Sequence, residues 1–300
     1  MRIDERLASG SEPSFSFEFF PPKTDEGERN LGRALAELSR MNPTFVSVTY
    51  GAGGNAQQKA KTVDIVSSIK TIHGLEAMAH FTCVGATVGE LRETLDRMRD
   101  AGIKNVLALR GDPPLGETEW TATEGGLEYS RELIEMIRAD YDFAIGAACF
   151  PEVHIHAESA ESDLRYLKEK VDAGARFLIT QLFFDNGFYY DFVARARDIG
   201  IDVPIIPGIM PITDVNQIKR ITGMCGASIP AELLHELDLR SDQPGAVSDL
   251  GVAHATLQCA DLLANGAPGI HFYTLNRSPA TRAILSALRI LAPWRRAVPA

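Results

Sequence analysis

Residues 15–20 alternate between two kinds of side chain, as the two-residue period of a β-strand requires. One face carries Phe15, Phe17 and Phe19, and the other carries Ser16, Glu18 and Phe20. The dipeptide Pro21-Pro22 then ends the run, because proline cannot donate to a strand ladder. The pattern predicts a strand that sets one carboxylate among aromatic rings.

The same alternation of strand and helix repeats along the chain. A helix is predicted from Thr24 through Leu38, where acidic residues in the first turn precede apolar residues at helical spacing. Further strands are predicted at 44–50, 77–83, 104–110, 143–149, 176–183, 203–208 and 269–274. Further helices are predicted at about 56–72, 87–101, 127–139, 160–173, 187–199, 213–222, 230–240, 246–265 and 279–291.

Eight strands, each followed by helix, predict an α/β fold, a single (β/α)8 TIM barrel. We expect one catalytic domain over residues 1–300, with an inserted helical segment around 223–250. A doubly wound open sheet is the rival architecture. The sequence contains no G-x-G-x-x-G or G-x-x-x-x-G-K-S/T motif, so the barrel is preferred.

Composition narrows the function classes. The 300 residues are 45% hydrophobic and 23% charged, as in an ordinary globular protein, and the net charge of -10 argues against nucleic-acid binding. We expect no signal peptide and no membrane span, because no apolar run approaches about 20 residues. The four cysteines, Cys83, Cys149, Cys225 and Cys259, form no CxxC pair. This spacing suits a reducing cytoplasm.

In a barrel of this kind the chemistry lies at the carboxyl ends of the strands. The predicted ends carry Glu18, Thr49-Tyr50, His80, Thr82, Arg110-Gly111-Asp112, Phe150 to His154, Gln181, Pro207 to Met210 and Tyr273 to Arg277. The sixth strand offers Gln181 where a Schiff-base aldolase needs lysine. His154-Ile155-His156 lacks carboxylates to complete a metal site, so no metal is expected. The remaining groups suit proton transfer and ring recognition, with a cofactor for redox chemistry.

Glu18 is the candidate general acid. A carboxylate among rings is poorly solvated, so its pKa is expected to rise, and a raised carboxyl delivers a proton near neutral pH. The alternative is a glutamate whose head reaches water or pairs with an arginine. On this stretch alone the alternative is the stronger interpretation.

Six motifs, taken together and in order, resemble the bacterial methylenetetrahydrofolate reductases. They are Phe17-Glu18-Phe19-Phe20-Pro21-Pro22, Ser47-Val48-Thr49-Tyr50-Gly51-Ala52, Leu109-Arg110-Gly111-Asp112, Pro151-Glu152-Val153-His154, Thr180-Gln181 with Phe183-Phe184-Asp185, and His271-Phe272-Tyr273-Thr274-Leu275-Asn276-Arg277. The resemblance runs from about residue 15 to 290. Several motifs in register are far more specific than any one of them.

The resemblance implies an enzyme that takes hydride from NADH or NADPH onto FAD and passes it to 5,10-methylenetetrahydrofolate, giving 5-methyltetrahydrofolate in a ping-pong cycle. Such an enzyme serves one-carbon metabolism and methionine biosynthesis. Glu18 matches the family's general acid, which protonates the N10 side of the folate ring. Asp112 matches an aspartate near both flavin and pterin. Gln181, Tyr273 and Arg277 match substrate-binding positions. We also expect a homo-oligomer.

The resemblance also implies a set of cofactor-lining positions. They are Thr49, Tyr50, Ala52, His80, Arg110, Gly111, Asp112, Tyr129, Phe150, His154, Ala157, Asp163, Tyr166 and Lys170. Within this set Arg110 and Lys170 would offset the FAD diphosphate. For Tyr50 and His80 the alternative role is packing in the barrel mouth.

Four positions depart from the family pattern. Phe150 replaces a tyrosine, Tyr166 and Glu169 replace an asparagine and an arginine that contact the flavin tail, and Ile221 replaces a phenylalanine beside the nicotinamide. Two other functions therefore stay open. One is direct hydride transfer from NAD(P)H to the folate without flavin. The other is a barrel that binds folate or a corrinoid partner as a methyl-transfer module.

Overall fold

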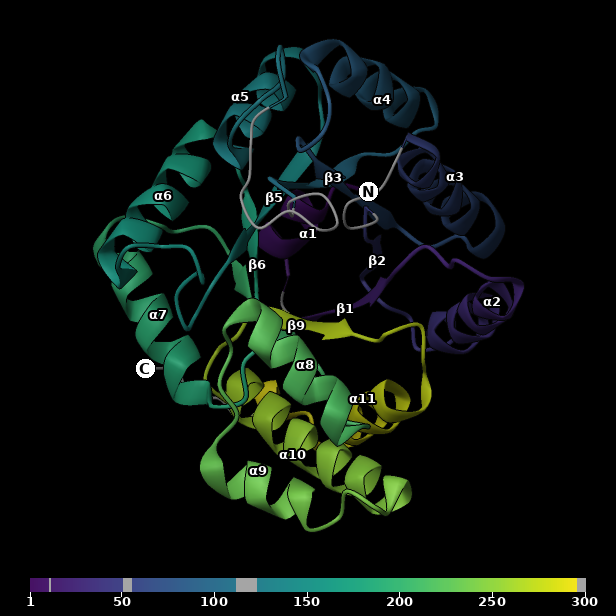
Figure 1. Ribbon diagram of the computed structural model, residues 1–300, viewed down its shortest axis with the longest axis vertical. Coiled ribbons are helices and arrows are strands. Elements are labelled where there is room, and N and C mark those ends of the chain that lie inside the picture. The colour runs from purple at the N-terminus through teal and green to yellow at the C-terminus, as the bar shows by residue number, and fades with distance from the viewer. Residues whose placement is uncertain (11, 51–55, 112–122, 296–300) are drawn as a thin grey trace.

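The computed structural model describes residues 1–10, 12–50, 56–111 and 123–295. Its strands form one parallel sheet in the order β7-β6-β5-β4-β3-β2-β1-β9-β8. They are β1 (Ser14–Phe19), β2 (Phe45–Val48), β3 (Ala77–Thr82), β4 (Asn105–Leu109), β5 (Ala144–Cys149), β6 (Phe177–Thr180), β7 (Ile205–Ile206), β8 (Gly208–Ile209) and β9 (Gly269–Tyr273). Figure 1 shows the helices as a ring around these strands.

The strands β7 and β8 are two halves of one strand, parted only by Pro207. β7 pairs with β6 and β8 pairs with β9, so the two ends of the sheet meet here. Across the break the Pro207 carbonyl accepts a 2.9 Å hydrogen bond from the His271 N–H, and the Gly208 N–H donates to Thr180 Oγ1 at 2.9 Å. The predicted (β/α)8 barrel is confirmed, with its seventh strand bent at the proline.

The helices follow the predicted alternation closely. They are α2 (Asp25–Ser39), α3 (Ala56–His73), α4 (Val88–Asp100), α5 (Ser130–Asp140), α6 (Ala160–Ala173), α7 (Asn186–Asp198), α8 (Val215–Cys225), α9 (Ala231–Asp238), α10 (Pro244–Ala264) and α11 (Pro279–Leu291). The stretch 223–250 contains the end of α8, all of α9 and the first turns of α10. These helices enclose a second apolar cluster, which includes Ile218, Leu233, Leu237 and Val247.

The two faces of β1 serve different layers. Phe15, Phe17 and Phe19 pack in the core between strands and helices, together with Leu31 and Leu35 of α2. The opposite face looks into the barrel. There, a separate apolar cluster fills the interior, and its members are Ile3, Phe45, Met78, Leu107, Phe177, Ile179 and Ile206. The barrel interior is therefore packed solid below the polar residues at its mouth.

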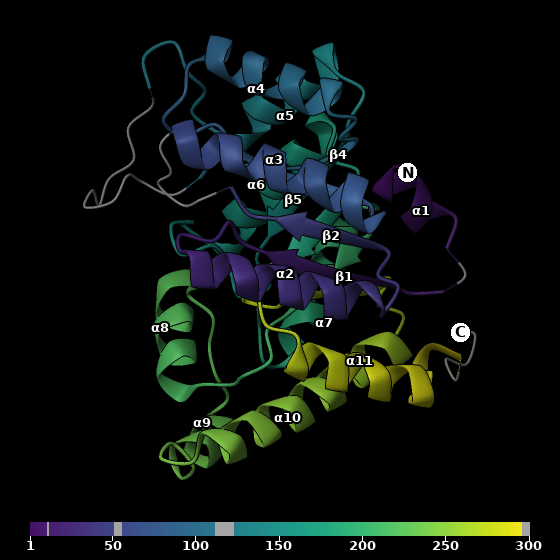
Figure 2. The same cartoon turned by 90° about the vertical axis from the view of Figure 1, so that its right-hand side faces the viewer.

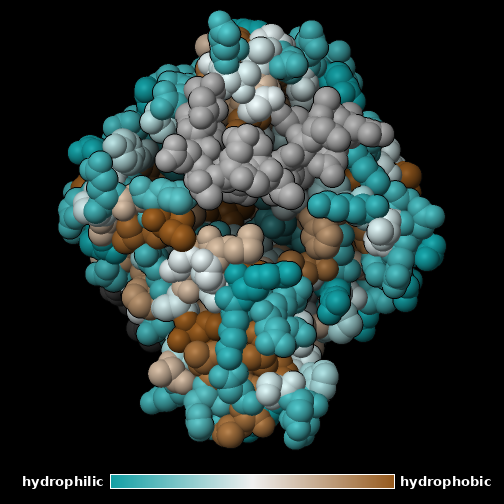
Figure 3. Space-filling view, in the orientation of Figure 1, coloured by the Kyte–Doolittle hydropathy of each residue, from teal (hydrophilic) through white to brown (hydrophobic). Residues whose placement is uncertain are grey.

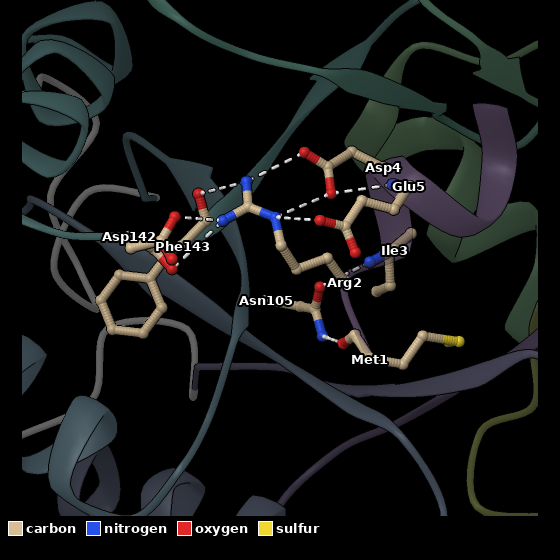
Figure 4. A network of polar contacts seen from close by, with 8 residues as sticks. All are labelled: Met1, Arg2, Ile3, Asp4, Glu5, Asn105, Asp142 and Phe143. Atoms are coloured by element: carbon tan, nitrogen blue, oxygen red, sulfur yellow. Dashed lines mark hydrogen bonds and ion pairs between the residues drawn. The ribbon is translucent and has the colours of Figure 1, made fainter.

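Two short elements escaped the sequence analysis: α1 (Ile3–Ala8) and the 3₁₀ turn η1 (Pro293–Arg295). Figure 2 shows α1 at the end of the barrel opposite α8. Ile3 donates its N–H to Asn105 Oδ1 at 2.8 Å, and the Arg2 guanidinium binds Asp4 and the loop before β5 at Asp142 (Figure 4). These contacts hold α1 over the amino-terminal end of the barrel. The carboxyl-terminal end, where the active site of such a barrel lies, is not covered by α1.

Candidate active site

A carboxylate and two imidazoles meet at the carboxyl end of the barrel. Glu18 Oε2 lies 3.3 Å from His80 Nε2 and 3.4 Å from His271 Nε2. The three residues come from β1, β3 and β9. The Glu18 side chain is 17% exposed and that of His271 is fully buried. We call Glu18, His80 and His271 the acid cluster.

A hydroxyl orients the second imidazole. Ser16 Oγ lies 2.8 Å from His271 Nδ1, so the serine donates to Nδ1 when the hydrogen is on Nε2. The hydrogen on Nε2 then points at the Glu18 carboxylate. The Phe45 ring stacks on the imidazole with the ring centroids 6.1 Å apart. His271 is thus held on three sides and presents one nitrogen to Glu18.

The predicted rise in the pKa of Glu18 is wrong for this structure. Burial acts to raise the pKa of the carboxyl, but the two imidazoles together outweigh it and hold the pKa below its ordinary value. The aromatic neighbours that motivated the prediction, Phe17 and Phe19, lie on the opposite face of β1. Burial also lowers the pKa of His80, although the negative charge of Glu18 acts to raise it.

Tyr273 lies beside the acid cluster, and its phenol hydroxyl already has a hydrogen-bond partner. Its hydroxyl donates to the Thr180 carbonyl oxygen at 2.6 Å. Burial, with the Glu18 charge nearby, raises the pKa of this phenol well above its ordinary value. Gln181 follows Thr180 at the end of β6, and its Oε1 accepts a hydrogen bond from the Leu182 N–H at 2.8 Å. Arg277, in the turn after β9, is exposed.

The loop between β5 and α6 forms a second polar group. Asp163 Oδ2 accepts from the His154 N–H at 3.1 Å, and the Phe150 and His154 rings meet edge to face with centroids 4.5 Å apart. Lys170 Nζ donates to the Ala148 carbonyl at 2.7 Å. Burial lowers the pKa of Lys170 and raises that of Asp163.

A family model described as methylenetetrahydrofolate reductase matches residues 2–289. The chain belongs to the methylenetetrahydrofolate reductase family. Among its relatives is the 5,10-methylenetetrahydrofolate reductase of Escherichia coli K12, at 41% identity over 92% of this chain and 90% of the relative. Methylenetetrahydrofolate reductase (NADH) 1 of Arabidopsis thaliana is 40% identical over 99% of this chain and 53% of the relative.

The chain spans about half the length of the plant and yeast relatives that it matches. Among solved structures, a protein from Clostridium thermocellum described as binding two copies of 5-methyl-5,6,7,8-tetrahydrofolic acid has a TM-score of 0.60 at 15% identity. The match covers 96% of this chain and 98% of that one. A dihydropteroate synthase from Xanthomonas albilineans follows with a TM-score of 0.52 at 12% identity, over 96% and 94% of the two chains. These likenesses support the fold assignment.

The methylenetetrahydrofolate reductase resemblance also predicted that Arg110, Gly111, Tyr129 and Tyr166 line the cofactor. Arg110 Nε donates to the Gly111 carbonyl at 3.4 Å, and Gly111 has φ +96°, where an added Cβ would lie 2.3 Å from Val84 Cγ1. Tyr129 and Tyr166 are each 50% exposed. The space-filling view shows a polar surface broken by apolar patches around the mouth (Figure 3).

The remaining predicted cofactor-lining residues include some that the structure describes and some that it does not. Tyr50 is buried edge to face against Phe81, with ring centroids 5.5 Å apart, and burial raises its pKa to about 12. Thr49 is half-buried, and Ala157 donates its N–H to the His154 carbonyl at 2.8 Å. Asp112 and Ala52 lie outside the described residues, so the structure gives no account of their predicted roles.

Three of the residues that depart from the family pattern contact neighbouring side chains. Glu169 on α6 lies 3.6 Å from Arg131 Nε of α5, so the carboxylate pairs with a cation of the neighbouring helix. Arg165 stacks over the Tyr166 ring at 5.0 Å from its centroid. Ile221 is half-buried and packs against the second apolar cluster. Helix α6 thus carries an exposed tyrosine and a glutamate that pairs with an arginine of α5.

His271 is the site residue that sequence reasoning missed. It appears in the motif that carried the resemblance, but no role was assigned to it. The available signal was the strand period: His271 lies two residues before Tyr273, so both side chains share one face of β9. Register then pairs Ser16 with His271 across β1 and β9.

The described residues contain neither a candidate metal-binding group nor a candidate membrane-spanning helix. No three His, Cys, Asp or Glu side chains of the described ranges gather where they could share a metal ion. Within the same ranges, no helix has the length and apolarity needed to cross a membrane. Each of the four cysteines is a free thiol.

Proposed function

We propose that this chain reduces 5,10-methylenetetrahydrofolate to 5-methyltetrahydrofolate with NADH or NADPH as hydride donor. Family membership supports the reaction class. The observation that carries the proposal is the acid cluster, because opening the folate's five-membered ring needs a proton delivered in a site otherwise shielded from water. The two imidazoles at 3.3 and 3.4 Å hold the Glu18 carboxyl group where it could act as such a donor.

In this proposal Glu18 delivers the proton, and the two imidazoles hold its carboxyl group in place. The carboxyl is ionised in the free protein, since the imidazoles hold its pKa down. A bound pterin covers the exposed 17% of the side chain and removes water from the carboxylate. Lost solvation raises the pKa of the carboxyl, so the carboxylate takes up a proton from solvent as the pterin binds and passes it to N10 of the folate.

The substrate-binding roles follow from the same rim. Gln181 and Tyr273 flank the pterin position, and the exposed Arg277 guanidinium suits a carboxylate of the glutamate tail, which it can bind through two parallel N–H groups. Asp112 is proposed to lie near both the pterin and the cofactor and to stabilise developing positive charge. The Tyr273 hydroxyl is bonded to Thr180, so this residue would contact folate with its ring.

The rim residues fit a flavin in part. FAD, when bound, supplies a hydride relay between the nicotinamide and the folate. Arg110 and Lys170 supply positive charge for a diphosphate, and the left-handed Gly111 allows close backbone approach. The proposed cofactor-lining residues are Thr49, Tyr50, Ala52, His80, Arg110, Gly111, Asp112, Tyr129, Phe150, His154, Ala157, Asp163, Tyr166 and Lys170. Lys170 keeps one hydrogen on the Ala148 carbonyl and has two others to donate.

A spectrum of the purified protein, followed by anaerobic addition of NADH, tests the flavin role. We expect flavin absorbance that bleaches with NADH and returns on addition of 5,10-methylenetetrahydrofolate. The Glu18→Gln variant should lose folate reduction and keep NADH oxidation by a quinone, because only the folate step needs the proton. Loss of both half-reactions in a folded, yellow Glu18→Gln protein would contradict the assigned role.

A second candidate is direct hydride transfer without flavin. The observation that favours it is the Glu169–Arg131 pair at 3.6 Å, which leaves the outer rim with a neutralised cation where an FAD tail would need positive charge. A colourless protein with full folate reductase activity decides for this candidate. A yellow protein whose colour bleaches with NADH decides against it.

A further inference from the structure

Side chains continue the pairing of β1 and β9 beyond the end of both strands. The last paired residues are Glu18 and Tyr273. Next, Thr274 Oγ1 donates to the Glu18 carbonyl at 2.6 Å. Then the Asn276 carboxamide binds both backbone groups of Phe20: its Oδ1 accepts from the N–H at 3.0 Å, and its Nδ2 donates to the carbonyl at 2.9 Å. The backbone from the Glu18 carbonyl to Phe20 is therefore tied to residues 274–276.

The turn that carries Asn276 has an unusual backbone. Leu275 has φ +50° and Asn276 has φ +56°, and among the described residues they are the only neighbouring pair outside glycine with positive φ. Such conformations cost free energy, although asparagine tolerates them better than most residues. Asn276 is 6% exposed, and the Arg277 N–H closes the turn on the Thr274 carbonyl at 2.9 Å. The buried carboxamide therefore holds a strained turn in place.

We propose that Asn276 is a positioning residue, which sets the Glu18 carboxylate between its two imidazoles and fixes Arg277 relative to it. The proposal rests on the proposed function, because it assigns Asn276 to the proton delivery and substrate binding of that site. Glu18 is two residues from the clamped Phe20, so a shift of the Phe20 backbone moves the carboxylate. Arg277 is the next residue along the chain, so both ends of the substrate site depend on one side chain.

The chemistry of the clamp explains why asparagine stands there. The position needs one donor and one acceptor on a short side chain, together with a left-handed backbone. Aspartate lacks the donor and would set a carboxylate oxygen against the Phe20 carbonyl. Glycine accepts the backbone conformation and lacks both polar groups. Asn276→Gly therefore removes the clamp and Asn276→Asp removes its donor half, and neither variant forces the backbone to change.

The test measures two half-reactions in wild type, in Asn276→Gly and in Asn42→Gly. Asn42 is the matched control, because it also has positive φ (+43°) and lies in the exposed turn between α2 and β2. We expect Asn276→Gly to reduce folate roughly 10- to 100-fold more slowly, as displaced catalytic groups do. Its NADH–quinone half-reaction should stay within about twofold of wild type, since no proton from Glu18 is used there.

A pH profile separates positioning from a general loss of structure. Moving Glu18 away from the imidazoles raises its pKa, so the pH at which the folate half-reaction has fallen by half should move upward in Asn276→Gly and stay fixed in Asn42→Gly. An unchanged folate rate and profile in a folded Asn276→Gly protein overturns the proposal. If that variant does not fold, Asn276→Asp decides by the same two measures. A wild-type protein that never reduces the folate overturns the proposed function instead.

Discussion

The phenol of Tyr273 donates a 2.6 Å hydrogen bond to the carbonyl oxygen of Thr180. This bond links β9 to β6 across the strand that bends at Pro207. At this bend, the Gly208 N–H donates a hydrogen bond to the Thr180 hydroxyl. Tyr273 is therefore part of the closure of the barrel as well as of its mouth.

Tyr273→Phe is expected to lower the free energy of unfolding by about 1–3 kcal/mol, because the variant leaves the Thr180 carbonyl unsatisfied in a buried place. The dissociation constant for 5-methyltetrahydrofolate should change less than about threefold, since a bonded phenol has little to offer a ligand. Urea unfolding and calorimetric titration measure the two quantities. Tyr189→Phe is the control, because its hydroxyl donates to the buried Ile205 carbonyl at 2.8 Å. A large affinity loss confined to Tyr273→Phe would show that the phenol binds folate directly.

Gly208→Ala is expected to destabilise the protein by about 1–3 kcal/mol through overpacking. An added Cβ would lie 2.4 Å from the Thr180 carbonyl oxygen and 2.7 Å from the Tyr273 ring. Gly223→Ala is the control, since no atom lies within 4 Å of the added Cβ on α8. That change should stabilise by roughly 0.5–1 kcal/mol through lower backbone entropy. Equal midpoints of urea unfolding for the two variants would contradict the close contact at Gly208.

The barrel could be predicted because its signals are local. Each strand shows its alternation within a few residues, and each helix its apolar spacing and its cap, such as the Thr24 hydroxyl that accepts from the Gly27 N–H at 3.1 Å. The six-residue α1 has too few turns to give a periodic signal. The bend at Pro207 depends on which neighbour each half pairs with, and that choice is made by strands far away in the sequence.

The site was predicted by residue but not by environment. Glu18 was found from its strand, whereas its partner His271 lies 253 residues further along the chain. Local reasoning therefore gave Glu18 its aromatic neighbours in sequence and the wrong direction for its pKa. In the barrel those neighbours face the helices, and the register of β1 with β9 brings an imidazole instead.

Ser16→Ala is expected to slow the folate half-reaction by roughly tenfold and to cost about 1 kcal/mol of stability, because it removes the 2.8 Å contact that orients His271. Ser47→Ala is a close control, since Ser47 Oγ is buried on the neighbouring strand and, among the described residues, has no hydrogen-bond partner. That variant should be as stable as wild type or more so. Stopped-flow reoxidation by the folate and urea unfolding measure both effects. Equal folate rates in the two variants would leave Ser16 without a role.

Acidification should weaken the fold in two separate windows, and the sign follows from the direction of each pKa shift. Burial lowers the pKa of His80 in the folded protein, whereas an unfolded histidine takes its proton at about pH 6.5. Below that pH the unfolded state binds more protons, so stability falls as the pH drops toward the folded pKa of His80. The pKa of Glu18 is also lowered, so its stabilising contribution is complete above about pH 4.3 and is lost only below that value.

The imidazole window can be followed by measuring the free energy of unfolding at about pH 7 and about pH 5, on either side of the ordinary pKa of histidine. We expect a smaller loss of stability between these pH values in His80→Gln than in wild type. His254→Gln should also reduce the loss, because burial lowers the pKa of His254 on α10. Only His80→Gln should slow the folate half-reaction, since His80 belongs to the acid cluster and His254 does not. An undiminished loss in His80→Gln would mean that His80 carries its proton in the folded protein, with Glu18 as its permanent counter-ion.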